Sequence, residues 1–116
     1  MKIQLLVNGK ALDATLNDSA ASRDFMSLLP LTLTLTDYAS NEKIADLPKK
    51  LSLQGAPAGI DPEVGDITYY APWGNLAIFY RDFGYAKGLV SLGRINADMS
   101  LFAGKSAMQV TMRRTE

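Results

Sequence analysis

The sequence predicts a mainly β protein, a closed antiparallel barrel of about eight strands capped by two short helices. Stretches in which apolar and polar residues alternate with the period of a strand recur along the chain, and only two short helical patterns interrupt them. None of the expected strands is long, and closure into a barrel removes the many edges that short strands would expose. With 116 residues and a 47% apolar share, residues 1–116 are expected to form a single domain with one core.

The first element is a β-hairpin. Apolar residues alternate with polar ones over residues 2–8, although Leu6 interrupts the polar face, and the alternation returns over residues 12–16. Asn8 and Gly9 between them are the residue pair that the two positive φ angles of a type I′ turn require. This is the strongest local signal in the chain.

A helix is expected over Ala20–Leu29. Asn17–Ser19 supplies the polar side chains typical of a helix N-cap, and Pro30 ends the segment. The following run, Leu31–Thr36, alternates leucine with threonine and predicts a strand with one buried face.

Residues 38–65 are expected to be irregular because proline and glycine are spaced through them, with a short strand near Leu51–Leu53. The remaining elements follow in order. They are strands at Asp66–Ala71, Asn75–Arg81 and Leu89–Ile95, a short helix at Met99–Ala103, and a last strand around residues 108–113.

The composition excludes several kinds of function. The chain contains neither histidine nor cysteine, which removes Ser-His-Asp and Cys-His nucleophile systems and the usual zinc ligands. Twelve basic residues balance twelve acidic ones, so no electrostatic argument favours nucleic acid or a membrane surface as partner.

No apolar run is long enough for a signal peptide or a membrane span, and the expected compartment is the cytoplasm. No cofactor and no metal are expected, because Asp61, Glu63 and Asp66 lack the spacing of a calcium loop.

Three runs of the sequence look familiar when taken together. They are Arg23–Pro30 before the leucine and threonine strand, the stretch from Pro57 to Ile67, and Tyr69–Tyr80. Together they resemble the small bacterial cyclophilin-like family, which has no established function. The resemblance covers nearly the whole chain and implies an eight-stranded cyclophilin-type barrel closed by two helices. Cyclophilins that act as prolyl isomerases use an arginine within a Phe-His-Arg run, which a chain without histidine cannot contain, so the catalytic residues stay unknown.

The candidate binding residues come from a cluster in which seven of the chain's aromatic residues fall within seventeen positions. Aromatic rings with a nearby arginine are suited to an amphipathic ligand, so we expect a groove for a small molecule or a short peptide. The alternative is that the rings belong to the barrel core and its rim. The predicted ligand-binding residues are Tyr70, Trp73, Phe79, Tyr80, Arg81, Tyr85 and Arg94.

Two other functions remain open at this stage. One is a peptidyl-prolyl cis-trans isomerase in which Arg81 or Arg94 polarises the peptide carbonyl beside the aromatic residues, a reaction that needs no histidine. The favoured alternative is that these arginines form surface ion pairs, such as Arg81 with Asp82 or Arg94 with Asp98. The other function is a homodimeric interaction module with exposed aromatic anchors, here Trp73, Phe83 and Tyr85.

Overall fold

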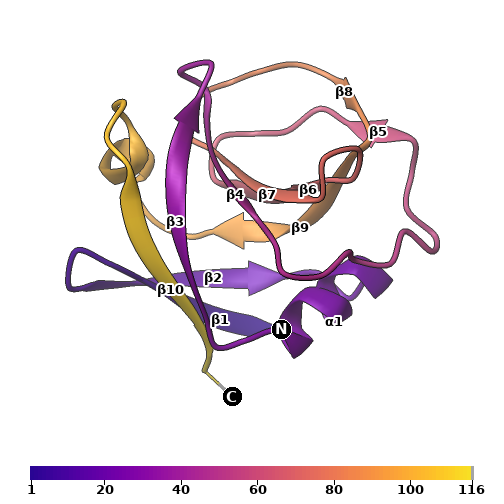
Figure 1. Cartoon of the computed structure of the whole chain (residues 1–116), viewed down its shortest axis with the longest axis horizontal. Coiled ribbons are helices and arrows are strands. Elements are labelled where there is room, and N and C mark those ends of the chain that lie inside the picture. Colours follow the sequence, from indigo (N-terminus) through magenta and orange to yellow (C-terminus); the bar gives the residue numbers. More distant parts are fainter. Residues whose placement is uncertain (116) are drawn as a thin grey trace.

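The computed structural model describes residues 1–115 and contains a closed barrel of eight antiparallel strands (Figure 1). In their order around the barrel, the strands are β1 (Lys2–Val7), β10 (Met108–Arg114), β3 (Leu31–Tyr38), β4 (Glu42–Asp46), β7 (Asn75–Phe79), β6 (Asp66–Tyr70), β9 (Leu89–Ile95) and β2 (Lys10–Leu16). A separate two-stranded sheet pairs β5 (Gly59–Ile60) with β8 (Ala86–Lys87). The predicted fold class is therefore confirmed.

The first hairpin joins β1 to β2 through the turn that the sequence predicts. Asn8 has a φ of 50° and Gly9 a φ of 78°, the left-handed conformation that a type I′ turn needs at both central positions. The turn fixes the register in which Val7 lies opposite Lys10. That register places the apolar side of β1 inside the barrel, where Ile3 and Leu5 are fully buried.

One α-helix and one 3₁₀ turn accompany the strands. Helix α1 (Ala20–Ser27) begins at Ser19, whose hydroxyl accepts a hydrogen bond of 3.1 Å from the Ser22 N–H. The helix covers one end of the barrel and ends two residues before the predicted Leu29 (Figure 1). The second expected helix is the 3₁₀ turn η1 (Met99–Phe102), and Asp98 accepts a hydrogen bond from its Ser100 N–H. No helix within residues 1–115 combines the length and the apolar character that crossing a membrane requires.

The segment expected to be irregular contains a strand that the sequence did not reveal. Strand β3 continues to Tyr38, the chain reverses through Ala39 and Ser40, and β4 then runs beside β3 and β7. The strand expected near residues 51–53 is wrong. Leu51 is buried without belonging to a sheet, because its N–H donates instead to the Tyr69 hydroxyl at 3.3 Å.

Strand β7 is buried on both faces, and this positions the site described below. Alternate side chains, those of Leu76, Ile78 and of Tyr80 just beyond the strand, pack into the barrel core. Ala77 and Phe79 belong to a second apolar cluster on the outer side, where residues of β5 and β8 cover them. The strand itself is shorter than expected, since it ends at Phe79.

Candidate functional site

A cavity of about 350 Å³ lies on the outer side of the barrel, over β4, β7 and β6. Its floor comes from outward-facing side chains, because strand alternation brings every second residue to this side. Asn75 and Phe79 line the floor from β7, and Leu89 lines it from β9. All three side chains are almost completely buried. We call this cavity the groove.

The first wall of the groove is a set of three aromatic rings. Trp73, in the turn between β6 and β7, meets Tyr38 edge to face with ring centroids 5.7 Å apart and planes at 86°. The same indole meets Tyr70 in the same manner at 5.4 Å and 84°. Aromatic pairs in this geometry contribute about 0.5–1.5 kcal/mol each beyond the area that they bury. The indole is therefore held in place although 58% of Trp73 is exposed.

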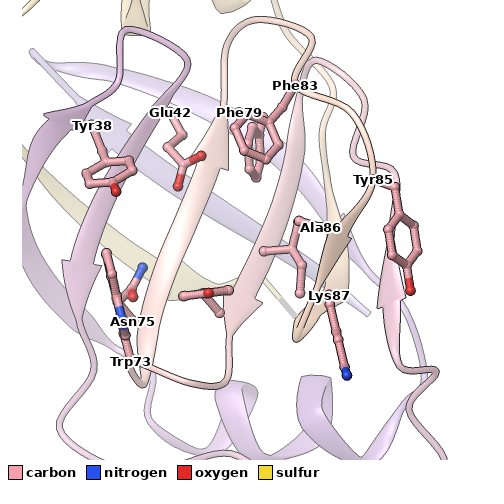
Figure 2. A pocket seen from close by; sticks show the side chains of 11 residues that line it. Tyr38, Glu42, Trp73, Asn75, Phe79, Phe83, Tyr85, Ala86 and Lys87 are labelled. Atoms are coloured by element: carbon pink, nitrogen blue, oxygen red, sulfur yellow. The ribbon is translucent and has the colours of Figure 1, made fainter.

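The opposite wall is the segment between β7 and β9. Phe83 packs against Phe79 with ring centroids 5.7 Å apart, and Tyr85, Ala86 and Lys87 continue the wall along β8 (Figure 2). Pairing of β8 with β5 holds this segment in place. Phe83 is 48% exposed and Tyr85 is 63% exposed. The groove thus has solvent-accessible aromatic surface on both sides.

Two largely buried polar side chains of the groove have oxygens without a hydrogen-bond partner. Glu42 is only 9% exposed, and no hydrogen bond or ion pair to its carboxylate occurs within residues 1–115. Burial is the main cause that raises the pKa of this carboxyl to about 7, and the negative charge of Asp37 contributes in the same direction. Asn75 donates from Nδ2 to the Leu76 carbonyl at 3.0 Å, whereas its buried Oδ1 accepts no hydrogen bond.

Comparison with known proteins assigns the chain to a family. The model of the cyclophilin-like family matches residues 5–113, almost the whole chain. The chain belongs to the cyclophilin-like family. Among solved structures, it is similar to a hypothetical protein from Archaeoglobus fulgidus, with a TM-score of 0.69 and 17% sequence identity over 99% of this chain and 95% of that one. At that identity the likeness concerns the fold alone. No curated protein matches the chain.

Within this cyclophilin-like barrel, four of the seven predicted site residues line the groove. They are Tyr70, Trp73, Phe79 and Tyr85. The other three are placed elsewhere. Tyr80 points into the barrel, and its hydroxyl donates a short hydrogen bond to the Asp37 carboxylate. Burial and this hydrogen bond raise the pKa of Tyr80 to about 12.

The two predicted arginines do not line the groove. The Arg81 guanidinium lies over the Tyr80 ring, with its central carbon 5.8 Å from the ring centroid. Arg94 donates to Asp66 at 3.1 Å and to Glu63 at 3.5 Å. The sequence interpretation named Asp98 as the partner of Arg94, and that pairing is wrong because Asp98 caps η1 instead. Two of the three acidic loop residues, Glu63 and Asp66, are thus engaged by an arginine. No cluster of metal-ligating side chains occurs within residues 1–115.

Sequence reasoning missed Tyr38, Glu42 and Asn75 as groove residues. Tyr38 and Glu42 lie opposite each other in the β3–β4 hairpin, which the sequence did not reveal. The register of β4 against β7 then sets Glu42 opposite Phe79. Asn75 carried a usable signal, since a polar residue directly after an aromatic turn and before a wholly apolar run predicts a buried polar side chain.

Proposed function

We propose that this chain is a binding protein that holds a small ligand or a short peptide segment in the groove. A cavity of about 350 Å³ is at the small end of the range that small-molecule sites occupy. The aromatic rings on its two sides offer large contact areas at a low cost in conformational entropy. We also propose the cytoplasm as its compartment, since a chain without cysteine does not depend on an oxidising environment.

The observation that carries this proposal is the fixed orientation of an exposed tryptophan. Trp73 is held on two sides by Tyr38 and Tyr70, so its face toward the groove is formed before any ligand arrives. Preformed aromatic surface lowers the ordering cost of binding.

The isomerase alternative has less support from the geometry. It relied on Arg81 or Arg94 as the group that polarises the peptide carbonyl, and neither lines the groove. A peptide bound in the groove would meet Glu42 and Lys87 as its charged neighbours. We therefore place binding before catalysis and leave isomerase activity as an outcome of the test below.

Trp73 is the only tryptophan of the chain, so its fluorescence reports on the groove directly. A collection of small polar aromatic compounds and short X-Pro peptides is titrated against the protein while the emission is recorded. We expect hits that shift the emission and that lose at least about fivefold in affinity in Phe83→Ala. Leu53→Ala removes an equally exposed apolar side chain that does not line the groove, and it serves as the control.

Two results would contradict the proposal. One is a collection without any ligand that shifts the Trp73 emission. The other is a set of hits whose affinity is the same in Phe83→Ala and Leu53→Ala, because such ligands bind elsewhere. Two-dimensional NMR exchange peaks between the cis and trans forms of an X-Pro peptide, seen only with catalytic amounts of protein, would favour the isomerase instead.

A further inference from the structure

The Glu42 carboxylate is an unusual lining for an aromatic groove. Figure 2 shows it pointing into the groove between Tyr38 and Phe79. It is nine-tenths buried, with no hydrogen bond or ion pair from residues 1–115. An ionised carboxylate buried without a partner is costly, so either it takes up a proton or an external group supplies the missing positive charge.

No lysine or arginine among residues 1–115 forms an ion pair with Glu42. Lys43, the next residue in the strand, projects to the opposite face of β4, where its amine donates to the Gly104 and Ser106 carbonyls. Lys87 belongs to the far wall and is exposed. Arg81 lies over the Tyr80 ring, outside the groove. The position beside Glu42 is thus open to a cation from outside.

The rings around this carboxylate favour the same kind of ligand. Tyr38 lies opposite Glu42 across the β3–β4 ladder, and Phe79 lies opposite it across the β4–β7 ladder. The faces of aromatic rings carry negative charge density and attract cations. A carboxylate among aromatic rings is the arrangement that binds organic ammonium groups in proteins of many folds.

The other end of the floor adds a second acceptor. Asn75 lies on the same face of β7 as Phe79, four residues away. Its Nδ2 donates to the Leu76 carbonyl, whereas its buried Oδ1 has no partner. The oxygens without a partner on the two largely buried polar side chains, Asn75 Oδ1 and the ionised Glu42 carboxylate, are therefore all acceptors. Such a lining calls for a ligand rich in N–H donors.

We infer that the groove selects organic cations, small molecules or peptide side chains that carry an ammonium or guanidinium group on an apolar or aromatic body. The cation binds against Glu42 between Tyr38 and Phe79, and the body of the ligand lies along the floor toward Asn75 and Trp73. This inference rests on the proposed binding function. It adds that the ligand is positively charged and that Glu42 is the residue that recognises this charge.

Binding of such a cation is linked to the protonation of Glu42. With a pKa of about 7, this carboxyl is about half protonated in the empty groove at neutral pH. A bound cation favours the ionised form, so binding releases protons and strengthens as the pH rises through 7. The titratable and charged groups near Glu42 are Asp37 on β3, whose pKa is lowered, Tyr80 at the end of β7, whose pKa is raised to about 12, and the side chains of Lys43, Arg81 and Lys87.

The test compares two probes of the same shape and different charge, 2-phenylethylammonium and neutral 2-phenylethanol. Both are titrated into the ¹⁵N-labelled protein, and the shifts of the Asn75 and Phe79 amides and the Trp73 indole are followed by NMR. We expect the ammonium probe to bind at least about tenfold more tightly than the alcohol at pH 8. Its affinity should rise from pH 6 to pH 8, whereas that of the alcohol should stay unchanged.

Two variants assign the preference to its residue. Glu42→Gln keeps the shape of the side chain and removes its charge, and it should bring the two probes to within about twofold of each other. Glu63→Gln removes a carboxylate that lies outside the groove, and it should keep the wild-type preference. The two probes on the wild-type protein test the inference even without a folded Glu42 variant.

The failures are distinguishable. If both probes shift the groove signals with equal affinity, the selection of cations is wrong and binding in the groove stands. If Glu42→Gln retains the preference, the assignment of that selection to Glu42 is wrong. If neither probe at millimolar concentration shifts any groove signal, the inference is wrong, and the fluorescence screen of the larger collection decides separately whether the proposed binding function stands.

Discussion

Lys43 and Asp37 face each other across the β3–β4 ladder inside one end of the barrel, with Nζ 3.5 Å from Oδ1. The same amine donates to the Gly104 carbonyl at 2.6 Å and to the Ser106 carbonyl at 2.9 Å. Asp37, the other member of the ion pair, also accepts a hydrogen bond from the Tyr80 hydroxyl. A lysine that is 1% exposed thus fastens the β3–β4 hairpin to the loop between η1 and β10. Its charge is fully paired, which is the condition for burying it.

Replacing this lysine should weaken the fold. Lys43→Met keeps much of the volume but leaves two carbonyls and the Asp37 carboxylate without their donor. We expect a loss of about 3 kcal/mol in the free energy of unfolding, measured by urea denaturation. Lys49→Met, at an exposed position, is the control and should change it by less than about 0.5 kcal/mol. A Lys43→Met protein as stable as this control would show that the network adds nothing to stability.

Glu42 should make the fold less stable as the pH rises from 4.5 to 7. Its pKa is about 7 in the folded chain and has its ordinary value of 4.5 in the unfolded one, chiefly because folding buries the carboxyl. Between these values the folded state binds more protons, so the free energy of unfolding falls with increasing pH. Glu42→Gln removes this dependence. The free energy of unfolding of the variant should therefore exceed that of wild type by an amount that grows from pH 4.5 to pH 7 and stays constant at higher pH. Equal pH profiles for the two proteins would contradict a raised pKa.

Asp37 affects the pH dependence of stability in the opposite direction, and it does so at lower pH than Glu42. The hydrogen bond from Tyr80 is the main cause that holds the pKa of Asp37 below its ordinary value of 3.8. Its stabilising contribution is present above that value and is lost as the pH falls through the folded pKa. Because Asp37 is unchanged in Glu42→Gln, its effect cancels when the two pH profiles are subtracted.

The elements that the sequence predicted are those whose local residues dictate them. Asn8 and Gly9 specify their own turn, and the leucines and threonines of β3 alternate without interruption. Strand β4 was missed because it buries Glu42 toward the groove and Lys43 toward the core, so that no apolar alternation is visible. Lys43 is tolerated there only through carbonyls more than sixty positions away in the sequence.

The groove was predictable to the extent that its residues are close in the sequence. Trp73 and Phe79 belong to the aromatic cluster and could be named from it. Tyr38 and Glu42 reach the same groove only because β4 lies between β3 and β7 in the barrel. Arg94 looked available for a ligand, but its partners come from the turn before β6, a contact that spacing does not reveal.

Gly93 is required where β9 passes β2. Its backbone conformation is open to any residue, yet a Cβ there would overlap the Thr15 carbonyl oxygen and lie 2.7 Å from the Leu16 Cα. The neighbouring register shift between β6 and β9 shows that this part of the barrel is already irregular. We expect Gly93→Ala to cost about 3 kcal/mol in the free energy of unfolding. Ser91→Ala on the same strand is the control. If the two substitutions change the free energy of unfolding equally, β2 can move away from the added methyl group without loss of stability.

The orientation of Trp73 should depend on its two tyrosine neighbours. The indole is exposed, and Tyr38 and Tyr70 contact it edge to face. Tyr38→Ala removes one of these contacts, worth about 1 kcal/mol, and should give the ring nanosecond freedom that the wild-type protein lacks. Time-resolved fluorescence anisotropy measures this motion without interference, since the chain has a single tryptophan. Tyr85→Ala alters the opposite wall and should leave the decay unchanged. If Tyr38→Ala also leaves it unchanged, the backbone of the turn alone orients the indole, and the wall of the groove does not depend on its neighbouring rings.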